Sequence, residues 1–329
     1  MNINEIAAMA GVSRATVSRY LNNGYVSAEK KEQIRKVIEE TGYQPSAQAQ
    51  MLRTKRTGFI GIILPQINSD SVSRMVHGIS SILREKGYQL LLATTQNDIK
   101  EEIRCVKQLG RNHVDGIILI GTIFTKEHYR VMKDIEIPLV VLAQCVKEYS
   151  CVYYDDYGAA KELTKKALEH GSNPAFIGAL LEDEAVGQER LYGFLDANFE
   201  LDRAIKEGYC INDIDSIERG YENAKSLFHM DSEIDTLICA TDMIAMGAMR
   251  FLKESGKRIP EDVQIAGLGD NIVSKVCEPK LTTVHFYYKT SGEEAAKMLI
   301  NMIEDSLPVL KEMKIGYQII ERETFRKDG

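Results

Sequence analysis

Apolar residues recur every three to four positions in three short stretches at the start of the chain, and this spacing predicts three helices. They are expected at Asn2–Ala10, Arg14–Asn22 and Ala28–Thr41. Asn2 and Glu5 have the spacing of a capping box at the start of the first helix. Gly11 ends that helix, and Ser13 is a suitable N-cap for the second. Two helices joined by a short turn that contains glycine indicate a helix-turn-helix.

From Gly58 onward, short apolar runs alternate with longer amphipathic stretches. The apolar runs predict strands at Phe59–Leu64, Gln89–Ala93, Asp115–Ile120, Leu139–Leu142, Ala175–Leu180, Thr236–Ala240 and Val263–Leu268. Helices are expected between them, among others at Ser71–Glu85, Lys100–Arg111, Tyr157–His170, Gly187–Phe199 and Met243–Ser255. Because the strands are apolar on both faces and the crossovers are long, the pattern predicts parallel sheets covered by helices. A stretch of about 270 residues exceeds one comfortable core, which favours two α/β lobes.

The charge of the chain is distributed unevenly between these parts. The whole chain has a net charge of −7, with 41 Lys and Arg against 48 Asp and Glu. Residues 1–56 contain nine Lys or Arg and five Glu, a charge of +4, which leaves −11 for the rest. A basic N-terminal segment on an acidic body is typical of a protein that contacts DNA phosphates with that segment alone.

The second predicted helix has an inward face and an exposed face. Val17 and Leu21 lie four positions apart and are expected to point into the core. The exposed side then carries four residues that can enter a major groove, namely Arg14, Ala15, Ser18 and Arg19. An arginine can pair bidentately with guanine, and the alanine methyl can contact thymine. The hydroxyls of Ser13, Thr16 and Ser18 suit phosphates. On spacing alone, a solvated amphipathic helix with incidental arginines is the alternative.

The residues of this segment resemble a known family. Residues 10–22 read A-G-V-S-R-A-T-V-S-R-Y-L-N, which is similar to the headpiece of the lac repressor (LacI/GalR) family. The residues after Gly42, Y-Q-P-S-A-Q-A-Q-M-L-R-T, resemble the hinge of the same family. The resemblance implies a sequence-specific DNA-binding repressor and favours a recognition helix over a solvated one.

The hinge resemblance implies a short helix that needs DNA and a second chain to hold it. Pro45 can start this helix, and residues 47–52 are mostly helix formers. A helix of about eight residues is marginal alone in water. In the family, two hinge helices pair in the minor groove and a leucine wedges between base steps, a role that falls here on Leu52 with Ala49 beside it. Ser46 belongs to the same expected DNA-contacting segment.

The body resembles the family's periplasmic-binding-protein-like fold, which has two doubly wound lobes around a cleft. Residues 150–159 resemble the first crossing between the lobes, and residues 279–284 resemble the return crossing. The expected fold class is therefore an all-α headpiece and hinge followed by an α/β body of two parallel-sheet lobes. The expected boundaries are a headpiece at 1–44, a hinge at 45–57, an N-terminal lobe at 58–156 plus 287–308, and a C-terminal lobe at 157–284 plus 313–326.

Polar residues follow the predicted strands, at the ends where parallel sheets bind ligands. The candidates for binding an effector are Gln66, Asn68, Asp70, Gln144, Arg190, Asp242 and Asp270. Carboxylates, amides and arginine suit the adjacent hydroxyls of a polyol. Loop-end Asp and Asn residues can instead cap helices, and for Asp242 this alternative is equally good. Arg190, in R-L-Y-G-F, resembles the family's effector arginine, and Asp242, in T-D-M-I-A-M-G-A, resembles a second family motif.

Two departures from the family pattern bear on the effector. Gly269 stands where a first carboxylate usually precedes Asp270, which predicts a rearranged sugar pocket. Residues 151–160 and 220–224 look most like regulators of disaccharides such as trehalose and sucrose. The trehalose branch has an arginine where Gln144 stands and basic residues where Gln188 and Glu189 stand, so a sugar phosphate is disfavoured. We expect an unphosphorylated di- or oligosaccharide inducer, with a sugar phosphate or a corepressor as the alternative.

Motifs typical of enzymes do not occur in the sequence. It contains no G-x-x-x-x-G-K-S/T loop, no H-E-x-x-H and no G-x-S-x-G, and the six histidines show no ligand spacing. The six cysteines stand singly, which favours buried free thiols over a metal site or disulfides. We therefore expect no catalytic residue, no cofactor and no metal. A carbohydrate-acting enzyme that uses paired carboxylates is a remote alternative.

Location and assembly can also be predicted. The N-terminus lacks a secretory signal and no apolar run approaches a membrane span, which favours a cytoplasmic protein at DNA over a transport binding protein. No heptad extension follows residues 316–320, so the expected assembly is a homodimer. A two-fold dimer matches a near-palindromic double-stranded DNA operator.

Overall fold

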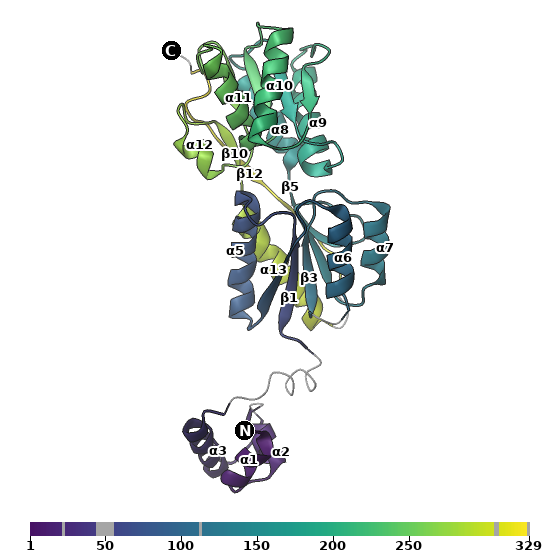
Figure 1. Ribbon diagram of the computed structural model, residues 1–329, viewed down its shortest axis with the longest axis vertical. Helices are drawn as coiled ribbons and strands as arrows, with labels where there is room; N and C mark the ends of the chain where they lie inside the picture. The colour runs from purple at the N-terminus through teal and green to yellow at the C-terminus, as the bar shows by residue number, and fades with distance from the viewer. Residues whose placement is uncertain (22–23, 44–55, 112–113, 306–308, 328–329) are drawn as a thin grey trace. The chain divides into compact units, whose positions relative to one another are not determined.

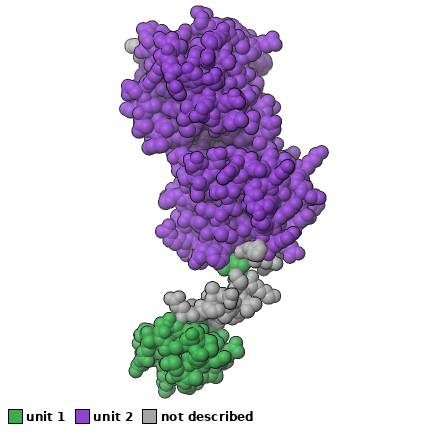
Figure 2. All heavy atoms as spheres, viewed as in Figure 1, with its two compact units in different colours: residues 1–58 green, residues 59–329 purple. Residues whose placement is uncertain are grey.

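The computed structural model describes residues 1–21, 24–43, 56–111, 114–305 and 309–327. The chain forms two compact units, residues 1–58 and residues 59–329 (Figure 2). The first unit contains the predicted helix-turn-helix, and the second contains both predicted lobes.

The first unit is a bundle of three helices, as predicted. They are α1 (Ile3–Met9), α2 (Arg14–Leu21) and α3 (Ala28–Thr41). Ile6, Val17 and Ile34, one from each helix, are fully buried together. The capping box is confirmed, because Asn2 Oδ1 accepts from the Glu5 N–H at 3.2 Å and a Glu5 carboxylate oxygen accepts from the Asn2 N–H at 3.0 Å. The φ of +62° at Gly42, where α3 ends, lies in the left-handed region that favours glycine.

The N-terminal lobe is built on a six-stranded parallel sheet with the order β11-β5-β4-β3-β1-β2 (Figure 1). Its strands are β1 (Phe59–Leu64), β2 (Gln89–Thr94), β3 (Gly116–Ile120), β4 (Leu139–Leu142), β5 (Ser150–Tyr154) and β11 (Glu312–Ile315). Helices α5 (Asp70–Glu85) and α13 (Tyr288–Glu304) cover one face, and α6 (Ile99–Leu109) and α7 (Lys126–Asp134) cover the other. Ile62 packs toward the first helix pair and Ile63 toward the second, which explains the continuous apolar strands.

The C-terminal lobe has a four-stranded parallel sheet with the order β7-β6-β8-β9. Its strands are β6 (Pro174–Gly178), β7 (Cys210–Asn212), β8 (Thr236–Cys239) and β9 (Gln264–Ala266). Its helices are α8 (Asp156–Ala167), α9 (Arg190–Glu200), α10 (Ile217–Met230), α11 (Asp242–Glu254) and α12 (Ile272–Val276), with a π-helical turn, η1 (Glu184–Glu189), before α9. The helix predicted at Gly187–Phe199 therefore begins as a π-turn.

The two lobes are joined by a short antiparallel pair, β10 (Thr283–Phe286) and β12 (Tyr317–Ile320) (Figure 1). The segments expected as crossings contain the strands β5 and β10, which the apolar pattern did not predict. It also missed β11, which pairs with β5 in the N-terminal lobe. The segment assigned to the C-terminal lobe from residue 313 therefore starts in the N-terminal lobe, because Met313 and Ile315 pack against the core from an edge strand.

Two further features bear on the sequence predictions. Cys105, Cys151 and Cys239 are buried free thiols as expected. Cys210 and Cys277 are free but only half-buried, and Cys145 is exposed, which corrects the prediction for these three residues. Among the helices in the described ranges, none is both long enough and apolar enough to span a membrane.

Candidate functional site

Helix α2 presents a polar face to solvent. Arg14, Ala15 and Arg19 are exposed, Ser18 is half-buried, and Val17 on the opposite side is fully buried. The expected inward and outward faces of the helix are thus observed.

Hydrogen bonds at the N-terminus of α2 cap this helix. Ser13 Oγ accepts from the backbone N–H of Thr16 at 3.2 Å and lies 2.9 Å from its hydroxyl. Ser13 is therefore the N-cap that the sequence predicted. Arg35 on α3 is held by Glu32 and by Glu39, the latter at 2.7 Å. The predicted hinge contacts at Ser46, Ala49 and Leu52 lie outside the described residues.

A cleft of about 740 Å³ lies between the two lobes of the second unit. We call it the interlobe cleft. It is formed where the carboxyl ends of β1, β2 and β3 face those of β6 and β7, as ligand sites of parallel sheets are. Its polar walls include Gln66, Asn97, Asp98 and Glu102 from the N-terminal lobe and Asp183 and Asp215 from the C-terminal lobe. Its aliphatic walls include Val72, Ile99, Ile123, Leu180, Val186 and Ile214.

The charge of the interlobe cleft is one-sided. Four of its lining residues are carboxylates, and no Lys, Arg or His is among the described residues that line it. Each carboxylate oxygen can accept a hydrogen bond from a hydroxyl group. The cleft therefore suits a ligand with many donors, and it opposes an anion.

Asp183 connects the two lobes at the cleft wall. Its Oδ1 accepts a hydrogen bond of 2.7 Å from Gln144 Nε2 and one of 3.0 Å from the Val186 N–H. Gln144 also donates to the Thr122 carbonyl at 3.1 Å. Desolvation raises the pKa of Asp183, and the nearby charge of Arg190 opposes this effect. Gln144, predicted to bind the effector directly, thus lies behind a lining residue and bridges the lobes.

Asp215 lines the cleft from the C-terminal lobe. Its Oδ1 accepts a hydrogen bond of 2.6 Å from Thr241 Oγ1. The surrounding walls raise its pKa through desolvation, with the Thr241 hydroxyl and Arg190 acting in the opposite direction. One oxygen of Asp215 therefore remains available to a ligand.

Arg190 is buried behind the cleft and already has protein partners. Its Nη2 lies 2.6 Å from Asp156 Oδ1, its Nε donates to the same oxygen at 2.8 Å, and its Nη1 donates to the Ala240 carbonyl at 2.6 Å. The guanidinium also lies 5.0 Å from the ring centre of Phe286. Burial raises the pKa of Asp156 to about 6 although Arg190 lowers it. Arg190 is not among the residues that line the cleft.

Asp242 and Asp270 are tied to the crossing segments. Asp242 is fully buried, and it accepts from the Asn271 N–H at 2.7 Å and from the Thr283 hydroxyl. The N-cap of α11 is Thr241, so the alternative that Asp242 itself caps the helix is wrong. Asp270 pairs with Arg322, with Lys275 at 3.2 Å and with His285 at 2.9 Å. Desolvation acts to raise the pKa of Asp270, but the hydrogen bonds to its carboxylate, that from Arg322 above all, hold this pKa below its ordinary value.

The three remaining predicted effector residues are Gln66, Asn68 and Asp70, and one of them lines the cleft. Gln66 lines the cleft, whereas Asn68 is exposed outside it. Asp70 begins α5 and lies 3.4 Å from Arg74. Of the seven predicted effector residues, Gln66 alone lines the cleft directly.

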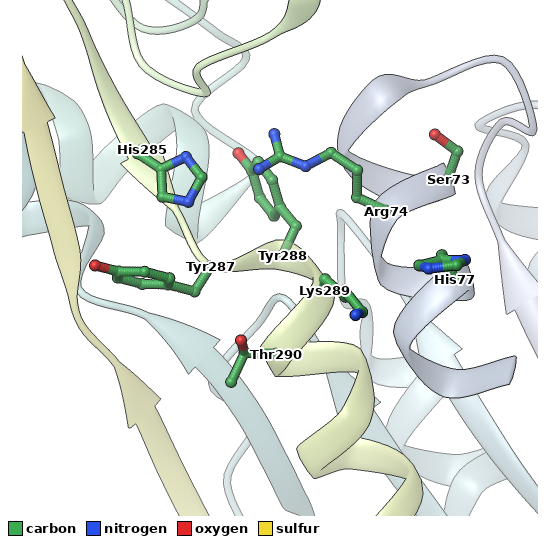
Figure 3. Close-up of a pocket in the computed structure, with 8 residues that line it drawn as sticks. All are labelled: Ser73, Arg74, His77, His285, Tyr287, Tyr288, Lys289 and Thr290. Carbon is green, nitrogen blue, oxygen red and sulfur yellow. The ribbon is translucent and has the colours of Figure 1, made fainter. Parts of the chain in front are cut away.

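A second hollow, of about 410 Å³, lies beside the lobe crossing (Figure 3). Ser73, Arg74 and His77 of α5 face Tyr288, Lys289 and Thr290 of α13 across it, with His285 and Tyr287 on a third side. Arg74 lies 5.1 Å from the ring centre of Tyr288. His285, which lines this hollow, also contacts the Asp270 carboxylate, so Asp270 lies next to this hollow.

Four buried polar side-chain atoms have no hydrogen-bond partner among the described residues. They are Thr95 Oγ1, His128 Nε2, Asn198 Oδ1 and Asn212 Oδ1. Thr95 follows β2 two residues before Asn97, and Asn212 ends β7 two residues before Ile214. Such atoms are rare in folded proteins, and they often mark functional sites.

The sequence interpretation missed Asn97, Glu102, Asp183 and Asp215 as lining residues. The signal for Asn97 was present, since it follows a predicted strand by a few residues. Asp215 follows β7, a three-residue strand whose half-buried residues gave no apolar run. Glu102 was read only as part of an amphipathic helix.

The chain matches two protein families. Residues 57–323 match the periplasmic binding proteins and sugar binding domain of the LacI family, and residues 2–46 match the bacterial regulatory proteins of the lacI family. The sucrose operon repressor of Staphylococcus xylosus is 32% identical over 304 residues, which are 92% of this chain and 94% of that protein. The HTH-type transcriptional regulator CelR of Thermobifida fusca is 29% identical over 308 residues, with 91% and 90% covered.

Two solved structures show the same fold. A complex of the transcriptional regulator CelR with cellobiose has a TM-score of 0.77 at 25% identity, and the match covers 98% of this chain and 99% of that chain. The lac repressor dimer bound to operator and the anti-inducer ONPF has a TM-score of 0.87 at 20% identity, with 98% of both chains covered. The predicted fold class is confirmed by these matches.

Proposed function

Because this chain belongs to the LacI family of bacterial regulatory proteins and is a ligand-controlled DNA-binding repressor, we propose that its ligand is an unphosphorylated di- or oligosaccharide. The sugar occupies the interlobe cleft and acts as an inducer. The observation that carries this proposal is the one-sided lining of the cleft, with four carboxylates and no cation among the described lining residues. A phosphate group there would be repelled by these carboxylates and would find no cation among the described lining residues.

Relatives support the class of ligand. One similar protein is a sucrose operon repressor, and one similar structure is a complex of a regulator with cellobiose, and both sugars are unphosphorylated disaccharides. The cleft volume of about 740 Å³ lies within the range of sites that enclose a small molecule of this size. Gln66, Asn97, Asp183 and Asp215 supply the acceptors and amides that adjacent hydroxyls need, and the aliphatic walls cover the rings. Arg190 acts from behind, by placing a positive charge near Asp183 and Asp215.

The first unit reads the operator in this proposal. Arg14, Ala15 and Arg19 contact base edges from the exposed face of α2, while Ser13, Thr16 and Ser18 contact the backbone. The hinge residues Ser46, Ala49 and Leu52 insert at the minor groove of the same site. Two chains bind as a homodimer on a near-palindromic operator, because a two-fold protein fits a two-fold site. The exposed apolar residues Ile272 (62%) and Val276 (73%), one turn apart on α12, support such a contact.

Control of DNA binding follows from lobe movement. A ligand shifts the repressor only by its differential affinity for the operator-bound and free forms, and that coupling is reciprocal. The sugar draws the lobes together at the cleft and moves the start of the second unit, where the hinge attaches. Short hinge helices are near their folding limit, so a small separation melts them. The protein has no catalytic role and no cofactor in this proposal, and it acts in the cytoplasm at DNA.

A ligand screen with a DNA readout tests the proposal. Sucrose, cellobiose and trehalose are each compared with the corresponding 6-phosphate by thermal shift on the full chain. A bound ligand at 100 times its Kd should add about 2.7 kcal/mol to stability. The neutral sugar that stabilises the chain should also release operator DNA in an anisotropy assay. Stabilisation by a phosphorylated sugar alone, or tighter operator binding with ligand, would contradict the proposal.

A further inference from the structure

Glu102 is a buried carboxylate in the wall of the interlobe cleft. It lies on α6, only 5% of its surface is exposed, and it lines the cleft from the N-terminal lobe. Its neighbour Glu101 faces the other way and accepts from Arg104 Nε at 2.7 Å. Two adjacent carboxylates on one helix therefore have different surroundings, one an ion pair at the surface and the other the cleft.

His128 lies behind Glu102 and is also buried. Its Nε2 is 3.0 Å from Glu102 Oε1, and its Nδ1 accepts a hydrogen bond of 3.1 Å from the backbone N–H of Thr125. Because a nitrogen that accepts a hydrogen bond carries no proton, the ring proton is on Nε2, beside the carboxylate. Phe124 packs on the imidazole with 5.5 Å between ring centres. The imidazole is therefore held in place beside Glu102 by the Thr125 backbone and the Phe124 ring.

Gly121 makes this packing possible at the end of β3. A Cβ on Gly121 would lie 2.6 Å from the ring of Phe124 and 3.5 Å from Glu102 Oε1. A larger residue would displace the ring that holds His128, and with it the carboxylate. The backbone of β3 thus contributes to the position of Glu102.

Folding alone gives no reason for a carboxylate at this position. Among the described residues, His128 is the single side chain within ion-pair range of Glu102, and the contact of 3.0 Å between His128 Nε2 and Glu102 Oε1 lacks hydrogen-bond geometry. A buried carboxyl group needs hydrogen-bond donors to compensate its loss of water, and apolar side chains of similar size often fold as well as a buried pair of polar groups. A ligand in the cleft whose hydroxyls donate hydrogen bonds to Glu102 would supply the partners that the carboxylate lacks in the free protein.

We propose that Glu102 is a ligand-contacting residue, oriented by His128, which accepts hydrogen bonds from sugar hydroxyls and selects against phosphorylated sugars. His128 is a positioning residue that acts through Glu102. This inference rests on the proposed function, because it assigns a specificity determinant to the same cleft. Glu102 Oε1 lies 3.0 Å from the imidazole, and in this proposal Oε2 accepts the hydrogen bonds of the sugar hydroxyls.

Isothermal titration on the full chain with four probes tests the role of Glu102. The probes are sucrose, cellobiose, trehalose and sucrose 6-phosphate. Glu102→Gln keeps the size of the side chain and removes its charge, so it should weaken the tightest neutral sugar roughly tenfold to a hundredfold. It should also reduce the preference for sucrose over sucrose 6-phosphate, because the charge that repels the phosphate is removed. Glu101→Gln, one residue away on the solvated face, is the matched control and should leave both values unchanged.

Two variants of His128 test the positioning role. His128→Gln keeps an amide donor near the place of Nε2, whereas His128→Leu removes the donor and keeps the site filled. The glutamine variant should retain most of the affinity, and the leucine variant should lose about as much as Glu102→Gln. Thermal unfolding checks that each variant is folded. If the leucine variant does not fold, the glutamine variant decides: if it binds the neutral sugar as weakly as Glu102→Gln does, the positioning role is overturned.

The outcomes separate the two proposals. If Glu102→Gln binds the neutral sugar as tightly as the wild type does, Glu102 is not a ligand contact, while the proposed function stands. Equal affinities of two folded His128 variants overturn the positioning role. A wild type that prefers sucrose 6-phosphate, or binds none of the four probes, overturns both the inference and the proposed function.

Discussion

Gln144 of the N-terminal lobe donates a hydrogen bond of 2.7 Å to Asp183 of the C-terminal lobe, across the wall of the interlobe cleft. The same amide nitrogen is held by the Thr122 carbonyl at 3.1 Å, so the donor is fixed to one lobe and its acceptor to the other. Because one partner is a carboxylate, the bond is of the stronger, charge-assisted kind. The relative position of the lobes is therefore set partly by this contact.

Replacing Gln144 with Leu should loosen the lobes without unfolding them. The loss of a hydrogen bond to a charged group costs about 1.5–3 kcal/mol where both partners are buried, and Asp183 is only half-buried, so we expect the lower end. Small-angle scattering should show a larger radius of gyration, and titration should show weaker sugar binding. Gln188→Leu is the control, because Gln188 donates to the Leu181 carbonyl within one lobe. Equal changes in both variants would show that Gln144 does not connect the lobes.

Replacing Arg190 with Ala should destabilise the whole chain. It leaves the Asp156 carboxylate buried without its cation, which typically costs about 3–5 kcal/mol. The double variant Arg190→Ala with Asp156→Leu removes both charges and should recover much of that loss in urea unfolding. If the double variant binds operator but fails to respond to sugar, Arg190 also serves the ligand. If the single variant is as stable as the wild type, the ion pair contributes nothing to the fold.

These residues show where sequence reasoning succeeded. The core strands and helices could be predicted because each sheet is covered on both faces, which gives continuous apolar runs bounded by polar turns. The capping box at Asn2 and the end of α3 at Gly42 could be predicted because they depend on neighbours within a few residues. Strands β7, β11 and β12 could not, because they are short edge or crossing strands with half-buried residues.

The candidate site was predicted less well, and for a physical reason. The position of a residue after a strand shows which end of the sheet it occupies, but not which partner its side chain finds. Asp242 and Asp270 follow β8 and β9 as expected, yet Thr283 and Arg322, distant in sequence, bind their carboxylates. Glu102 lies three residues beyond the first residue of α6, where nothing local separates a cleft residue from a solvated one.

Stability should depend on pH through Asp242. Burial raises its pKa to about 6 from an ordinary value of 3.8. Between about pH 4 and pH 6 the folded chain thus holds a proton that the unfolded chain has released, so stability falls as the pH rises through this window. Relative to Asp242→Asn, which does not titrate, the wild type should lose about 3 kcal/mol at most between pH 4 and pH 7. Urea unfolding at several pH values measures the difference, and a difference that is constant or grows with pH would contradict the assignment.

Arg19 should carry sequence information to the operator. It is exposed on α2 and forms no salt bridge within the described residues, so its guanidinium is available to a guanine edge. Arg19→Ala should weaken operator binding by about 1–3 kcal/mol and relax specificity at one position of each half-site. Arg35→Ala is the matched control, because Glu32 and Glu39 already hold Arg35 on α3, and it should leave the base preference unchanged. Binding to a set of operators with single base changes, at fixed salt, distinguishes the two roles. An equal loss on operator and random DNA would show that Arg19 touches only phosphate, because a backbone contact weakens binding to all sequences alike.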